Sequence, residues 1–285
     1  MNCRIFRLAM AIKPGQKMAM TIASLTRRGL VALFLAGLAA SAQAAPRQLI
    51  IATEGAYPPY NFVAPDGTLQ GFDVDFAKAL CVKLQAECQI IQQNWDGMIP
   101  ALLARKYDLM VASMAILPER EKQIAFSIPY YQGPTALIMA RADAVRTGAD
   151  GYAEPQAMAG KRVGVQIGTV YEKFVRREWP GAEVLTYDTA DNADSDLRAG
   201  RIDARLDDYI VLRQSLLGAD QNGAFARVGK IWGGGPFGSR GQGVGLRPED
   251  AALKAEVDRA ILSMRDDGTY KAINDKYFDF DIYQP

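Results

Sequence analysis

Short apolar runs typical of strands alternate with segments of helical periodicity along most of the chain, and this alternation limits the fold most strongly. LIIAT (49–53), QIIQQ (89–93) and DLMVAS (108–113) are typical of buried strands. Between them, a helix is predicted at 73–87, and most of the segment 95–106 is also predicted to be helical. A β-α-β-α-β series places parallel strands in one sheet with helices on both faces. The sequence therefore predicts an α/β, doubly wound lobe.

A second series of the same kind predicts a second α/β lobe. Its strands are expected at 136–140, 162–167, 183–187 and 202–206. Its helices are expected at 171–179, 190–199 and 209–217, before a long helix over 248–265 and a last one over 270–278. The sequence contains no internal repeat, and no low-complexity linker separates the two series. We therefore expect two lobes with a cleft between them, connected by short strands.

The first 45 residues predict a cleaved secretory signal. This segment is basic, and an arginine pair precedes the apolar run LVALFLAGLAA (30–40). Small residues then supply a cleavage site after Ala44 or Ala45. A membrane anchor is the alternative, but the run is shorter than the roughly 20 residues that span a bilayer. We expect export to the periplasm without a lipid anchor, and residues 1–17 are consistent with a start codon placed too early.

The composition of the remaining chain excludes several classes of function. Of 33 basic residues six lie in residues 1–45, which leaves 27 against 32 acidic residues, a net charge of −5. Such a chain has no electrostatic pattern for nucleic acid or an anionic membrane. The absence of histidine excludes Ser-His-Asp and Cys-His catalysis. Cys81 and Cys88 favour a disulfide, although a metal site is the alternative; two thiolates without histidine bind zinc poorly, so neither a metal nor a cofactor is expected.

The stretch GFDVDF (71–76) contains two carboxylates that suggest either an acid/base pair or a helix start. Residues two apart on a helix point in different directions, so Asp73 and Asp75 are not expected to converge on one atom. Both favour the positive end of a helix dipole, and Asp73 is expected to cap the helix. We interpret the motif as the start of a helix.

Gly233, Gly235 and Gly238 formally spell the dinucleotide motif GxGxxG. That motif needs a strand before it and a helix directly after it. Here Pro236 interrupts the spacing and further glycines follow. A hinge, or a loop beside a hinge, is the favoured interpretation.

GFDVDF followed by AKALCVKL resembles bacterial solute-binding protein family 3, the periplasmic polar amino-acid and opine receptors of ABC importers. Further segments match in family order: ATEGAYPPYNF, WDGMIP, PEREKQIAFSIPYY, KRVGVQIGTVYE, AGRIDARLDD and DDGTYKAINDKYF. The resemblance covers about Gln48 to Tyr283 and implies the type II periplasmic binding protein fold, with two lobes connected by two hinge strands. It places lobe 1 at 46–134 and 233–285 and lobe 2 at 135–232. It also implies the disulfide Cys81–Cys88, which the lysine/arginine/ornithine and histidine receptors share.

The same resemblance implies how a ligand's α-amino acid group would be held. Arg120 matches the arginine that binds the α-carboxylate, as suits a forked and permanently charged guanidinium. Ser113 and Thr169 match the positions that donate hydroxyl and N–H groups to that carboxylate. Asp208 matches the acid that takes the α-ammonium, with Asp207 one register away as the alternative.

Three further residues are implied to form the side-chain pocket. Glu54 stands where receptors for basic amino acids place an acid, and Tyr57 and Trp95 match the aromatic walls. The chain departs from the best-known receptors, which have Asp in place of Glu54 and Phe in place of Trp95. Other departures fall at Ala112, Ala115, Gln166, Val170 and Tyr171. Parts of the sequence look closer to the octopine and nopaline receptors.

We therefore expect a periplasmic receptor for a cationic amino acid or an opine, acting as a monomer that delivers its ligand to an ABC permease in the inner membrane. The main alternative is an enzyme on the same fold, similar to cyclohexadienyl dehydratases, with Glu54 as general acid. A sensor domain is the third possibility, which a chain ending near Pro285 without a further segment disfavours.

Overall fold

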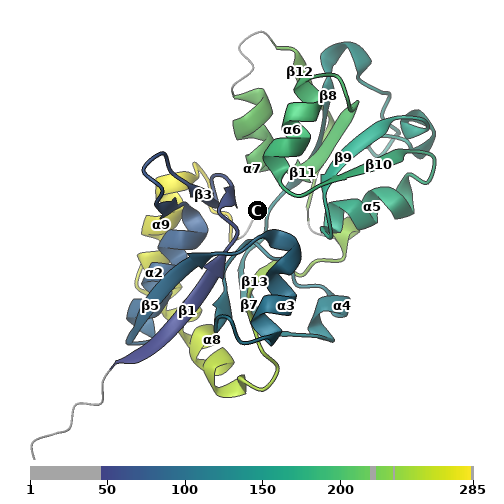
Figure 1. Cartoon of the computed structure of the whole chain (residues 1–285). Coiled ribbons are helices and arrows are strands. Elements are labelled where there is room, and N and C mark those ends of the chain that lie inside the picture. The colour runs from purple at the N-terminus through teal and green to yellow at the C-terminus, as the bar shows by residue number, and fades with distance from the viewer. Residues whose placement is uncertain (1–45, 219–222, 234, 284–285) are drawn as a thin grey trace, which may run out of the picture. The chain divides into compact units, whose positions relative to one another are not determined.

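Two five-stranded sheets and one small antiparallel sheet organise the residues that the structure describes, which are 46–218, 223–233 and 235–283 (Figure 1). The structure is a computed structural model. The predicted signal peptide lies outside the described residues. The small sheet consists of β2 (Ala56–Tyr57), β3 (Asn61–Val63) and β4 (Leu69–Gln70).

The first sheet has the strand order β5-β1-β6-β13-β7. Its strands are β1 (Arg47–Thr53), β5 (Ala86–Gln92), β6 (Leu109–Met110), β7 (Ala125–Tyr131) and β13 (Gln242–Leu246). Helices α2 (Phe72–Lys83), α8 (Ala251–Asp266) and α9 (Thr269–Tyr277) pack on one face, and α3 (Met98–Leu103) packs on the other. Side chains alternate along β1: Leu49 and Ile51 pack in the core cluster that contains residues of α2, α8 and α9, and Ala52 packs in the cluster that contains residues of α3.

The second sheet has the order β10-β9-β11-β8-β12. Its strands are β8 (Thr135–Ala140), β9 (Arg162–Gln166), β10 (Glu183–Tyr187), β11 (Ala204–Asp208) and β12 (Phe225–Trp232). The helices are α5 (Val170–Glu178), α6 (Ala190–Arg198) and α7 (Tyr209–Leu212), which continues into a π-helical turn over Arg213–Leu217. Leu137 and Met139 of β8 face one core cluster and Ala136 and Ile138 face the other, so both faces of this sheet are buried. The doubly wound, two-lobed fold predicted from the sequence is confirmed.

Several predicted details, namely the direction of some strands and the bounds of two elements, were wrong. Both large sheets are mixed, because β13 runs antiparallel to β6 and β7, and β8 runs antiparallel to β11 and β12. The helix predicted over 73–87 ends at Lys83, since Gln85 has a φ of 51° and β5 begins at Ala86. The strand predicted at 202–206 is shifted to Ala204–Asp208.

The strands support the lobe boundaries expected from the sequence, which stay a prediction. Strands from residues 47–131 and 242–246 form the first sheet, and strands from 135–232 form the second. The chain thus passes between the sheets twice. The glycine-rich stretch lies in the second passage and leads through η5 (Gly235–Phe237) to β13, without the long helix that a dinucleotide site needs. We call the first sheet with its helices lobe 1, and the second with its helices lobe 2.

The predicted disulfide is confirmed. Cys81 on α2 and Cys88 on β5 are joined by an S–S bond, which ties this helix to the edge strand of the first sheet. None of the helices among the described residues is long and apolar enough to cross a membrane.

Candidate functional site

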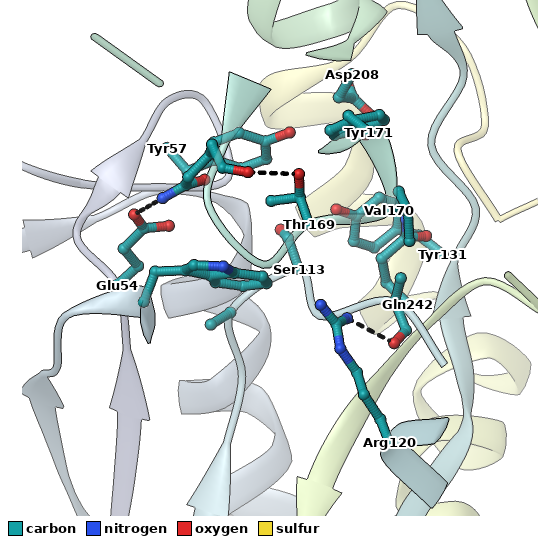
Figure 2. Close-up of a pocket in the computed structure, with 14 residues that line it drawn as sticks. Glu54, Tyr57, Ser113, Arg120, Tyr131, Thr169, Val170, Tyr171, Asp208 and Gln242 are labelled. Atoms are coloured by element: carbon teal, nitrogen blue, oxygen red, sulfur yellow. Dashed lines mark hydrogen bonds between the residues drawn. The ribbon is translucent and has the colours of Figure 1, made fainter. Parts of the chain in front are cut away.

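A pocket is lined by residues from both lobes (Figure 2). All seven residues that the sequence assigned to a ligand line it: Glu54, Tyr57, Trp95, Ser113, Arg120, Thr169 and Asp208. Glu54 directly follows β1, Thr169 follows β9, and Asp208 ends β11. These are carboxyl ends of strands, where open α/β sheets bind ligands. The structure thus brings the seven residues together, and their contacts with a ligand stay a prediction.

Arg120 is a buried cation that forms no hydrogen bond or ion pair with a carboxylate among the described residues. It belongs to α4 (Pro118–Glu121), and the residue is only 6% exposed. Its guanidinium donates to the carbonyl oxygens of Ala115 and Gly168, each at 2.9 Å. Burial lowers the pKa of Arg120 to about 10. Because the described residues give this guanidinium backbone acceptors only, an anion in the pocket would compensate its charge.

Glu54 is a buried acid on the lobe 1 side of the pocket. It is 4% exposed, and its Oε1 accepts a 2.6 Å hydrogen bond from Gln166 Nε2 of lobe 2 (Figure 2). Burial raises the pKa of Glu54 to about 7, although the bond from Gln166 opposes this rise. A cation in the pocket would therefore stabilise the charged form of this carboxyl group.

Asp208 is a second buried acid, on the lobe 2 side. Its Oδ1 accepts from the backbone N–H of Ile210 at 2.8 Å, and its Oδ2 accepts from Tyr60 Oη at 3.3 Å. Burial, together with the neighbouring Asp207, raises the pKa of Asp208 to about 8. A Cβ atom at Gly133 would lie 2.1 Å from Asp208 Oδ2, so only glycine fits there without a shift.

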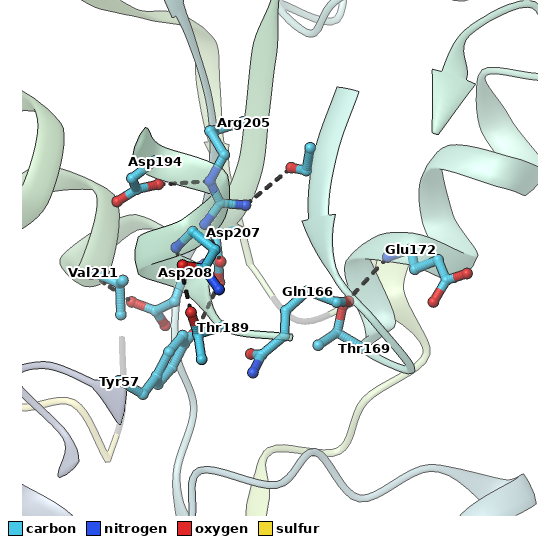
Figure 3. Close-up of polar contacts among 12 residues, drawn as sticks. Tyr57, Gln166, Thr169, Glu172, Thr189, Asp194, Arg205, Asp207, Asp208 and Val211 are labelled. Atoms are coloured by element: carbon cyan, nitrogen blue, oxygen red, sulfur yellow. Dashed lines mark hydrogen bonds and ion pairs between the residues drawn. The ribbon is translucent and has the colours of Figure 1, made fainter. Parts of the chain in front are cut away.

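Asp207 has a different role from its neighbour (Figure 3). Its Oδ2 accepts from Arg205 at 2.7 Å, and Arg205 also donates to Asp194 at 2.6 Å. All three side chains are at most 1% exposed. Asp207 Oδ1 accepts a 2.6 Å bond from Tyr57 of lobe 1 and does not line the pocket. Asp208, the acid that the sequence favours, is thus the one that faces the pocket.

The hydroxyl groups of Ser113 and Thr169 already have partners within the protein. Ser113 Oγ donates to Asp73 at 2.8 Å, and its N–H donates to Tyr130 Oη at 3.0 Å. Thr169 Oγ1 donates to the carbonyl of Gln166 at 2.7 Å and caps the N-terminus of α5. The expectation that these hydroxyls donate to a ligand therefore requires that they exchange partners.

The motif GFDVDF does begin a helix, but Asp73 does not cap it. Gly71 is the N-cap residue of α2, and it forms no side-chain capping bond. Asp73 is fully buried and accepts from Asn61 Nδ2, Ser113 Oγ and Tyr130 Oη, while burial raises its pKa to about 6. Asp75 points elsewhere, to Lys276 on α9. Asp73 therefore orients the pocket residue Ser113 by accepting a hydrogen bond from its hydroxyl group.

Two residues that line the pocket were missed. Tyr131 ends β7, and Gln242 begins β13, where its Oε1 accepts from the N–H of Gly133. Tyr131 ends the quoted stretch PEREKQIAFSIPYY, so a strand prediction there would have found it. Gln166, Val170 and Tyr171, which stand out in the sequence only as departures, also line the pocket. Among the described residues no group of three or more Cys, Asp or Glu is arranged to hold a metal.

The chain belongs to the bacterial extracellular solute-binding proteins, family 3, whose model matches residues 49–280. The chain is 36% identical over 255 residues to an L-arginine-binding protein of Pseudomonas aeruginosa, covering 88% of this chain and 96% of that one. It is 35% identical over 287 residues to an octopine-binding periplasmic protein of Rhizobium meliloti, covering 88% and 96%. A solved Salmonella typhimurium periplasmic binding protein, described as highly specific for arginine, superposes with a TM-score of 0.72 at 28% identity. That match covers 81% of this chain and 99% of the other. These relatives are named as binding proteins, not as enzymes.

Proposed function

We propose that the protein is a periplasmic receptor that binds a cationic amino acid or a related opine and delivers it to an ABC permease in the inner membrane. One observation carries the proposal: a buried guanidinium, which has no ion-pair partner among the described residues, and two buried acids line the same pocket. An amino acid with a cationic side chain carries one carboxylate and two cations. The pocket therefore offers one group of opposite charge for each charged group of such a ligand.

Arg120 would bind the α-carboxylate with its forked guanidinium, and Asp208 would accept from the α-ammonium. Glu54 would meet the cation at the end of the side chain. Tyr57 and Trp95 would form aromatic walls, and the Arg120 guanidinium already lies 5.5 Å from the centre of the Trp95 ring. A flat ring attracts a desolvated cation by roughly 0.5–2 kcal/mol.

Three hydrogen bonds join the two lobes and would stabilise the closed form of the receptor. Glu54 bonds to Gln166, Tyr57 bonds to Asp207, and Trp95 Nε1 donates to the carbonyl of Ile167 at 2.9 Å. A ligand that touches Arg120 in lobe 1 and Asp208 in lobe 2 makes its full set of contacts only when the lobes are closed. It therefore shifts the population toward the closed form, which the permease would recognise.

The test is calorimetric titration of ligand-stripped mature protein with arginine, lysine, ornithine, histidine, octopine, nopaline and glutamine. We expect micromolar or tighter binding of a cationic member, about −8 kcal/mol or better. Arg120→Met should abolish binding, and Glu54→Gln should weaken binding of the cationic ligand but not of glutamine. Silence across the panel by a folded protein would reject the proposal.

A parallel assay separates the receptor from the enzyme alternative. Prephenate and arogenate are incubated with the protein, and the absorbance of an aromatic product is followed. Turnover that Glu54→Gln abolishes would contradict the receptor assignment and identify Glu54 as a general acid. We expect no turnover above that of the Glu54→Gln variant.

A further inference from the structure

Gln166 is the lobe 2 residue that touches the pocket acid Glu54. It is the last residue of β9 and is 3% exposed. Its Nε2 donates to Glu54 Oε1 at 2.6 Å and to the backbone carbonyl of Asp188 at 2.9 Å. In the sequence Gln166 stands out only as a departure from the usual family residues. Its side chain is labelled in Figure 3.

These two bonds fix which atoms of Gln166 remain for a ligand. A side-chain amide has two N–H donors and one carbonyl acceptor. Both donors are used, one on each lobe, so the amide plane is held and only Oε1 remains. Among the described residues none donates to Gln166 Oε1. The side chain thus offers a ligand an acceptor and no donor.

Glu54 is left in a similar state. Its Oε1 is occupied by Gln166, and its Oε2 accepts no hydrogen bond from any described residue. This part of the pocket therefore presents two acceptor oxygens, one from a carboxylate of lobe 1 and one from an amide of lobe 2. The amide supports the carboxylate as well, because its bond opposes the rise in the pKa of Glu54.

A guanidinium and an ammonium differ in how they use such a pair. A guanidinium is planar, holds its N–H donors in a rigid fork and is weakly hydrated. It can donate to two oxygens at once while its flat face lies on an aromatic ring. An ammonium is a compact, strongly hydrated charge with three donors pointing in different directions. Two acceptors replace its water shell incompletely, so its desolvation is poorly compensated.

We propose that Gln166 determines specificity and, together with Glu54, selects a guanidino ligand over an ω-ammonium ligand such as lysine. This inference rests on the proposed function. The ligand chemistry could come from arginine or from an opine that retains the guanidinium. The two sources differ at the α-amino end, which Asp208 would hold under the proposed function.

The experiment measures the affinities of arginine, octopine and lysine for the wild type and for Gln166→Met, which keeps the side-chain length but removes both polar atoms. We expect the wild type to prefer a guanidino ligand to lysine by at least about tenfold. In Gln166→Met this ratio should fall about tenfold, mainly through weaker binding of the guanidino ligand. Whichever of arginine and octopine binds more tightly identifies the source.

Gln242→Met is the matched control, since Gln242 is the other glutamine that lines the pocket and contacts Gly133, not Glu54. It should change the affinities for arginine and lysine by the same factor. Gln166→Asn, which is too short to reach Glu54, provides a second variant if Gln166→Met does not fold.

The outcomes separate the two proposals. A wild type that binds none of the three ligands rejects the proposed function and this inference with it. A wild type that binds arginine, with the same selectivity over lysine in both Gln166 variants, rejects the role of Gln166 and leaves the receptor intact. Preference of the wild type for lysine also overturns the inference.

Discussion

Two buried carboxylates, Asp73 in lobe 1 and Asp207 in lobe 2, are held in different ways. Asp73 in lobe 1 has only neutral partners: an amide and two hydroxyl groups. Asp207 in lobe 2 is paired with the fully buried Arg205, which also binds Asp194. Burial raises the pKa of Asp73 to about 6, since no cation compensates its charge. Neutral donors orient Asp73, whereas Asp207 is held by a buried ion pair.

The difference also decides what each carboxylate can do for the pocket. Asp73 supports Ser113 within its own lobe. Asp207 has one oxygen committed to Arg205 and the other to Tyr57 of the opposite lobe, so it joins the lobes when they close.

Arg205→Met should have the largest effect, because it leaves Asp194 and Asp207 buried without a cation. We expect the free energy of unfolding to fall by about 3–5 kcal/mol. Chemical denaturation followed by circular dichroism measures this change. The triple variant Arg205→Met, Asp194→Asn, Asp207→Asn should recover much of the loss. A loss below about 1 kcal/mol in the single variant would show that the ion group is not needed.

Asp73 should make the stability of lobe 1 depend on pH. Its pKa is about 6 in the folded protein, against an ordinary value of 3.8 for the unfolded chain, so the folded form binds the proton more tightly. Its contribution is therefore fully present below pH 3.8 and is lost as the pH rises through 6, a change of about 3 kcal/mol.

Denaturation curves of the wild type and Asp73→Asn between pH 4 and 7 test this dependence. The difference between the two proteins isolates Asp73, because Glu54 and Asp208, whose pKa values are also raised, are present in both. Parallel pH profiles would contradict the assignment.

Removal of the disulfide should weaken lobe 1 by about 2 kcal/mol, because the loop that it closes is short. The double variant Cys81→Ala, Cys88→Ala is compared with the wild type by thermal unfolding, with and without ligand. We expect a lower midpoint and an unchanged ligand affinity, since neither cysteine lines the pocket. A change in ligand affinity would show that the packing of α2 against β5 influences the pocket.

Tyr57→Phe should have the smallest effect, on ligand binding and not on folding. It keeps the aromatic wall but removes the bond to Asp207, so the closed form is less stable. We expect about tenfold weaker binding, with faster dissociation. Tyr187→Phe is the control, because that hydroxyl bonds to Asp196 within lobe 2. Equal affinities of Tyr57→Phe and the wild type would show that this bond does not stabilise closure.

The elements that the sequence predicted well are those with clear periodicity, such as α5, α6, α8 and the strands β8 to β10. β13 was not predicted, because Gly243 and Gly245 give the segment low strand propensity. The structure explains these glycines. A Cβ atom at Gly245 would lie 2.4 Å from Met110 Cε, and one at Gly243 would lie 2.9 Å from Ile116. Packing between strands therefore overrides local propensity here.

For the site, the sequence determined the family, seven of the residues that line the pocket and which of Asp207 and Asp208 lines it, because the spacing of the family motifs carries that information in one dimension. Partners distant in the chain were decided only by the tertiary structure. Gln166 lies 112 positions from Glu54, and Tyr57 lies 150 positions from Asp207. Such pairs depend on how two sheets meet, and the environment that sets a buried group's charge depends on them too. The sequence by itself thus determined which groups are available, and packing decided which of them remain for a ligand.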